Sequence, residues 1–253
     1  MTPSSQPRVA YRVTIYPTRL TNLLVLAVLV LLANHVMLQV SHYQAGQGHW
    51  LVRQLFDVDE EDTIPTWFAT ALLLFCAQLL YAIATAKSRQ ANRFFRHWLG
   101  LAIGFLLLSI DEVAGLHEIL NTAIDVPWTI PAAFLLAIVA LAYVRFLLHL
   151  PAGCRIRFVL AGALFVGGAV GVEHATDGYW MEYGSDNLGY NLLTALEEGC
   201  EMFGIVLFIS ALLGYISQNE AHSIALGPMV EEQQPVCETD EPSLKGPLAE
   251  VEK

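Results

Sequence analysis

Seven carboxylates lie in or beside apolar segments of this chain, and almost no basic residue is near them in the sequence. They are Asp111, Glu112, Glu118, Glu173, Glu197, Glu198 and Glu201. No Lys or Arg occurs between Arg96 and Arg145, and none occurs between Arg157 and Lys245. A carboxylate in a low-dielectric environment requires a compensating cation or a proton. Because Lys and Arg cannot supply that charge here, the pattern points to bound metal ions, titrating protons or a cationic substrate.

Carboxylates combined with histidine are ligands that suit iron, manganese and zinc, and His174 directly follows Glu173. The sequence therefore predicts a site for a divalent metal ion, with iron, manganese or zinc as the cofactor. The predicted ligands are Asp111, Glu112, Glu118, Glu173, His174, Glu197, Glu198 and Glu201. No motif narrows the chemistry further. The Glu-x-x-His pairs of di-iron bundles are absent, and Asn121 stands where a His-Glu-x-x-His zinc motif beginning at His117 would need its second histidine.

The composition is that of a membrane protein. The chain has 253 residues, of which 55% are hydrophobic and only 15% are charged, with a mean hydropathy of +0.49. A soluble domain carries about 25% charged residues, and here the apolar residues also form long runs. No basic patch is large enough for nucleic-acid binding, so that class of function is excluded.

Six apolar runs are long enough to cross about 30 Å of hydrocarbon. They cover residues 20–40, 64–86, 97–120, 128–148, 156–176 and 190–216. We therefore predict an all-α, polytopic integral membrane protein with a bundle of six transmembrane helices at 20–216. Residues 1–19 are predicted to form a cytoplasmic N-terminal segment. Residues 217–253 are predicted to be a disordered cytoplasmic tail, because this acidic stretch is rich in Pro, Glu and Ser and has no aromatic residue.

The loops between these runs alternate in charge, which predicts their orientation. Basic residues gather before the first run and in the second and fourth loops, at Arg8, Arg12, Arg19, Lys87, Arg89, Arg93, Arg96, Arg155 and Arg157. The first loop instead carries the acidic residues Asp57, Asp59, Glu60, Glu61 and Asp62. The positive-inside rule then places both termini in the cytoplasm. The predicted location is a bacterial inner (plasma) membrane.

This orientation brings the acids of the third, fifth and sixth runs into the outer leaflet. Their helical phase at about 100° per residue indicates which faces pack together. On the third run, one narrow stripe contains Gly100, Gly104, Asp111, Gly115 and Glu118, with Glu112 and His117 to either side. On the fifth run, Ala163, Gly167, Gly171 and Ala175 recur every four residues. Small residues let helices approach closely, so we expect both stripes to be helix–helix contacts that also carry the acids.

Two classes of function fit a cation site in one leaflet. The first is a metal-dependent membrane enzyme that acts on a lipid or another apolar small molecule. The alternative is a cation- or proton-coupled transporter that uses the same acids as a relay. The enzyme is favoured because the cytoplasmic halves of the three acid-bearing runs are apolar. A non-catalytic scaffold would leave the deep acids Asp111 and Glu201 without a role. Membrane lipid is the expected partner in either case.

Overall fold

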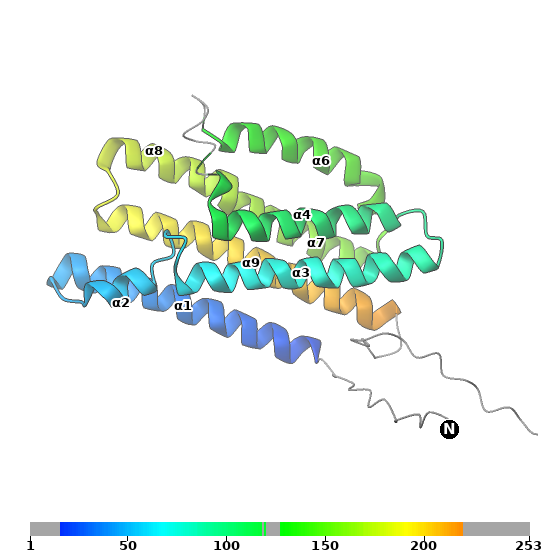
Figure 1. Cartoon of the computed structure of the whole chain (residues 1–253), viewed down its shortest axis with the longest axis horizontal. Helices are drawn as coiled ribbons and strands as arrows, with labels where there is room; N and C mark the ends of the chain where they lie inside the picture. The colour runs from blue at the N-terminus through cyan, green and yellow to red at the C-terminus, as the bar shows by residue number, and fades with distance from the viewer. Residues whose placement is uncertain (1–15, 118, 120–126, 220–253) are drawn as a thin grey trace, which may run out of the picture. The chain divides into compact units, whose positions relative to one another are not determined.

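The computed structural model describes residues 16–117, 119 and 127–219, and every regular element within them is a helix (Figure 1). The elements are α1 (Pro17–Ala45), α2 (Trp50–Leu55), α3 (Ile64–Arg89), α4 (Phe95–Ala114), α6 (Thr129–His149), α7 (Ala152–Val166), the π-helix η1 (Gly167–Val172), α8 (Glu173–Tyr183) and α9 (Leu188–Asn219). Within these described residues, six helical stretches are long and apolar enough to cross a membrane; α7, η1 and α8 together form one of them. The predicted all-α bundle of six spans is confirmed, and the chain is a multi-pass membrane protein. The predicted tail after residue 219 and the segment before residue 16 lie outside the described residues.

Successive spans run in opposite directions, so alternate loops lie at the same end of the bundle. The two ends differ in charge. We call the end where α1, α4 and α7 begin the basic end, since Arg19, Lys87, Arg96 and Arg155 lie at or near helix termini there. Figure 1 shows the first residues of α1 and the last residues of α9 at this end. We call the opposite end, where the loop 57–62 joins α2 to α3, the acidic end.

Helix α9 is the centre of the bundle and packs against α1, α3, α7, η1 and α8. Its buried stripe follows the helical period through Met202, Ile205, Ile209 and Leu212, each of which is at most 2% exposed. Toward the acidic end, the same spacing continues to Glu198 and Glu201. The sequence therefore places carboxylates on the stripe that is apolar in the rest of the helix.

The third span is shorter than predicted and ends before Glu118. Helix α4 stops at Ala114 because Gly115 adopts a left-handed conformation, with φ of 55°, and donates its N–H to the carbonyl of Asp111. The predicted stripe is interrupted at this turn, and Glu118 lies outside the described residues. The turn also redirects the chain at His117, with consequences for the site described below.

The predicted contact stripe on the fifth span is wrong. Ala163, Gly167, Gly171 and Ala175 are all exposed in the bundle, and Gly167 and Gly171 have open space around them. The contacts are instead made through Ala161, Gly168 and Thr176, which are buried. The π-helix η1 explains the shift only beyond it, because its wider turns rotate the faces of α8 relative to those of α7; Ala163 lies before it and is already exposed.

Candidate functional site

The end of α4 forms a compact turn that joins Asp111 to His117. The backbone N–H of His117 donates to Oδ1 of Asp111 over 3.0 Å, and Nδ1 of the His117 ring lies 3.2 Å from Oδ2. Both side chains are about three-quarters buried. Gly115 permits this turn, and the carboxyl group of Glu61 lies where a side chain at position 115 would be. In an unbroken helix, His117 would point away from Asp111. The left-handed turn at Gly115 instead brings the two side chains together.

A second pair of contacts links α8 to the start of α6. The Nε1–H of Trp128 donates to Oε1 of Glu173 over 2.6 Å. Next to it, Oγ1 of Thr129 lies 3.2 Å from Nδ1 of His174. The Trp128 ring also lies 5.2 Å from the His117 ring, centroid to centroid. Glu173 is thus connected to the Asp111 turn through Trp128, whereas the exposed His174 is placed at the margin of the site.

Helix α9 contributes three carboxylates to the interior of the acidic end. Glu197 lies within electrostatic range of Glu173 of α8. Glu201 lies within electrostatic range of Glu112, Glu173 and Asp111, and Glu198 lies within range of Glu201 and Glu112. Among the described residues, neither Glu198 nor Glu201 has a hydrogen-bond donor. These interactions bring acids of α4, α8 and α9 into one region, which we call the carboxylate cluster: Asp111, Glu112, Glu173, Glu197, Glu198 and Glu201.

A glycine allows η1 to approach this part of α9. A Cβ added to Gly168 would lie 2.8 Å from the carbonyl oxygen of Glu197, 2.9 Å from Cγ of Glu201 and 3.0 Å from Cβ of Cys200. These separations are shorter than normal contacts between side chains and backbone. Gly168 is therefore required for the distance at which α9 holds its acids against η1.

The first loop also brings acids to the cluster, which sequence reasoning missed. Asp59 accepts a hydrogen bond from the hydroxyl of Tyr190 over 3.2 Å and lies within electrostatic range of Glu197 and Glu198. Glu61 lies within electrostatic range of Glu112. The acidic run at 57–62 served only as evidence of orientation in the sequence. The sequence did contain a signal for this placement. The run at 57–62 directly precedes the second span, and the start of that span lies at the same membrane depth as the other acids.

The loop is held in this position by buried polar side chains of α1. His35 is 1% exposed; its Nε2 lies 3.1 Å from the carbonyl of Asn191, and its Nδ1 accepts from the backbone N–H of Val58 over 3.3 Å. Gln39 donates to Oδ2 of Asp57 over 3.1 Å. His35 therefore connects α1, α9 and the loop, and serves as a structural hydrogen-bonding residue.

The cluster is rich in negative groups and poor in positive ones. None of its six carboxylates forms an ion pair with Lys or Arg in the part of the chain that the structure describes, and the basic group beside Asp111 is the imidazole of His117. Among the same residues, no three His, Cys, Asp or Glu side chains are arranged so that they could hold a metal ion. Of the eight predicted ligands, the structure brings six together, leaves His174 at the edge, and does not describe Glu118.

The fold and this cluster define a class: a six-span α-helical membrane protein with a carboxylate-rich interior at one end. Residues 23–215 match the family described as Domain of unknown function (DUF8692), and the chain belongs to that family. No curated protein and no solved structure matches the chain.

Proposed function

We propose that the carboxylate cluster binds a divalent cation, and that the protein is a metal-dependent membrane enzyme acting on a lipid or another apolar substrate. The observation that carries this proposal is the convergence of six carboxylates from α4, α8 and α9, with Asp59 and Glu61 added by the loop and the imidazole of His117 beside Asp111. Ionised carboxylates within electrostatic range repel one another unless a counter-charge or protons are present. A bound cation supplies that charge and can polarise a substrate oxygen.

The position of the cluster favours an enzyme over a transporter. Below Glu201, the centre of the bundle consists of tightly packed apolar side chains, including Met202, Ile205 and Ile209. Trp98 of α4, which is 2% exposed, and Tyr215 of α9 close the core near the basic end with rings 4.9 Å apart. A site that is polar toward one end and apolar toward the other suits a substrate that enters and leaves on the same side. Transport would need a polar route through this core.

A relay of protons or cations is the second candidate, and one observation favours it. The acids form a series from the loop inward, because Asp59 is within electrostatic range of Glu198, and Glu198 is within range of Glu201. Successive carboxylates at increasing depth are the arrangement that proton pathways use.

Metal content and thermal unfolding of the purified full-length protein test the proposal. We expect iron, manganese or zinc in elemental analysis, a higher unfolding temperature with the bound metal, and a lower one after chelation. Saturation at 100 times the dissociation constant corresponds to about 2.7 kcal/mol of stabilisation. Glu201→Gln and Asp111→Asn, which remove charge and keep shape, should each reduce the metal-dependent shift. The matched control is Glu182→Gln, which changes an exposed acid of α8 outside the cluster.

Two results distinguish the candidates. A metal-dependent shift that Glu201→Gln reduces and Glu182→Gln preserves supports the cation site. If the protein binds no metal and both neutral substitutions in the cluster stabilise it, the acids are protonated at rest. That result contradicts the metal enzyme and favours the proton relay.

A further inference from the structure

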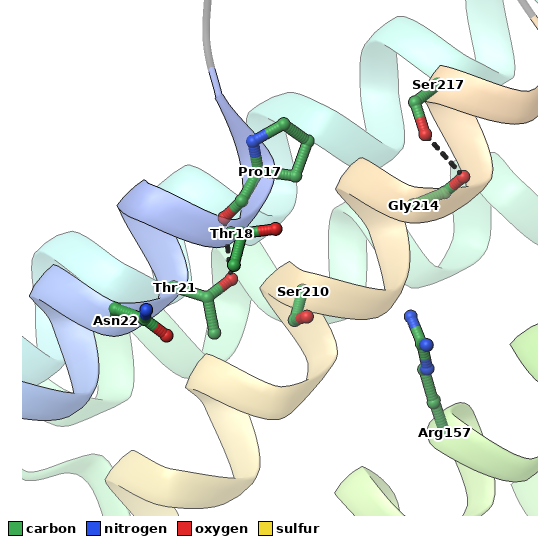
Figure 2. A pocket seen from close by; sticks show the side chains of 8 residues that line it. All are labelled: Pro17, Thr18, Thr21, Asn22, Arg157, Ser210, Gly214 and Ser217. Carbon is green, nitrogen blue, oxygen red and sulfur yellow. Dashed lines mark hydrogen bonds between the residues drawn. The ribbon is translucent and has the colours of Figure 1, made fainter.

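A polar cavity lies at the basic end, away from the carboxylate cluster. It has a volume of about 400 Å³ and is formed between the start of α1, the start of α7 and the end of α9. Figure 2 shows Arg157 of α7 extending toward α9, opposite Thr21 and Asn22 of α1, with Ser210 of α9 between them. Cavities of this size hold small molecules or parts of larger ones.

Every polar side chain that faces this cavity can donate a hydrogen bond, and Arg157 can only donate. Arg157, Asn22 and Thr18 are exposed and Ser210 is half-buried, and no side-chain hydrogen bond joins any of them to another described residue, so their N–H and O–H groups can reach a ligand in this open pocket. Of the described residues that line the cavity, none is an Asp or Glu. Such a lining favours an anion, because an anion accepts hydrogen bonds from every one of these groups.

Arg157 is placed to serve as the cationic centre of the cavity. Its guanidinium approaches α9 at Gly214, where Nη1 would be 3.4 Å from an added Cβ. It forms no ion pair with any described residue. A planar guanidinium matches the oxygens of a phosphate group with two parallel hydrogen bonds. Other polar groups in the lining are already used, since Thr21 donates to the carbonyl of Pro17 over 2.9 Å and Ser217 donates to that of Gly214 over 3.0 Å.

The start of α1 adds to the same preference for negative charge. The helix begins at Pro17, and the side chain of its N-cap residue, Tyr16, makes no capping hydrogen bond. The first N–H groups of a helix point out of its N-terminus and favour anions. Pro17 and Thr18 line the cavity, so this terminus borders the space that Arg157 enters.

We propose that this cavity binds a phosphate group, with Arg157 as its main ligand. Arg157 is the sixth residue of α7, which places it about 7–8 Å inside the helix end. That depth fits the phosphate of a phospholipid headgroup, and free phosphate has the same chemistry. The proposal is independent of the cation site, because the two sites lie at opposite ends of the bundle and favour opposite charges.

Native mass spectrometry of the delipidated full-length protein in detergent tests this proposal. Three probes are titrated: phosphatidylglycerol, diacylglycerol with the same acyl chains, and inorganic phosphate. We expect phosphatidylglycerol to bind more tightly than diacylglycerol, which lacks the phosphate. Arg157→Gln should weaken that binding about tenfold, as expected when a charge-assisted contact is lost. Ser210→Val removes a donor without changing charge and should weaken it by a smaller factor.

Arg155→Gln is the matched control, since Arg155 lies on the same helix, donates to the carbonyl of Leu148 and does not line the cavity. Competition by inorganic phosphate that depends on Arg157 supports a soluble phosphate as the ligand, whereas binding of the phospholipid alone supports a headgroup. Equal binding of phosphatidylglycerol and diacylglycerol overturns the proposal. An equal loss in Arg157→Gln and Arg155→Gln also overturns it, because general surface charge would then explain the binding.

Discussion

Replacement of Gly168 by alanine tests whether close contact between η1 and α9 holds the carboxylate cluster together. The added Cβ would lie 2.8 Å from a backbone oxygen of Glu197 and 2.9 Å from Cγ of Glu201. A backbone atom cannot move aside as the end of a flexible side chain does. Helix η1 must therefore shift away from α9, and the shift changes the distance between the acids of the two elements.

The expected cost follows from two opposing terms. Overpacking by one methyl group costs about 1–3 kcal/mol, and replacement of glycine by alanine in a compatible backbone contributes about 0.4–1 kcal/mol of stability. Gly171→Ala is the matched control, because Gly171 lies in the same π-helix with open space around it. The backbone term is common to both variants, so their difference in the free energy of unfolding should be the packing cost alone.

Thermal unfolding of the detergent-solubilised protein measures this difference. A packing cost of about 2 kcal/mol corresponds to about 4–8 °C for a chain of this size, with Gly168→Ala lower than Gly171→Ala. The metal-dependent shift proposed for the cluster should also be smaller in Gly168→Ala and unchanged in Gly171→Ala. If both variants unfold at the same temperature, close packing at Gly168 does not determine the geometry of the site.

Three further predictions concern the elements around the cluster. His35→Ala removes a buried side chain that forms hydrogen bonds with α9 and the first loop, and should lower the free energy of unfolding by about 2–4 kcal/mol. Thermal unfolding measures this loss, with His42→Ala as the control because His42 is a half-buried residue of the same helix. A loss no greater than that of the control would refute the prediction. Trp128→Phe keeps an aromatic ring, though a smaller one, and removes the donor to Glu173; it should lower stability by about 1–3 kcal/mol. A loss in the double variant with Glu173→Gln equal to the sum of the losses in the two single variants would show that the two side chains are not coupled. A label attached after Lys253 should react only in permeabilised cells, as expected for a cytoplasmic C-terminus; reaction in intact cells would reverse the orientation.

The sequence alone was sufficient to predict six membrane-crossing helices and the end of the bundle at which the acids gather. Both depend on local properties, namely the length of each apolar run and the position of an acid within it. Glu197, Glu198 and Glu201 could be assigned to one end of α9 because each residue advances a helix by a constant 1.5 Å. An error of one or two residues in the predicted start of a span therefore changes the predicted depth of an acid by only a few ångströms.

The tertiary structure decided which side chains meet, because rotation around a helix axis is sensitive to single residues. The turn at Gly115 brings His117 onto Asp111, and α7 packs on α9 through Ala161 and not through the predicted small-residue stripe. Asp59 reaches the cluster because the loop is held by contacts distant in sequence, such as the one between His35 and Val58. Hydropathy places a residue along the membrane normal. Its neighbours in the membrane plane depend on backbone irregularities and on long-range hydrogen bonds that hydropathy and helical period do not encode.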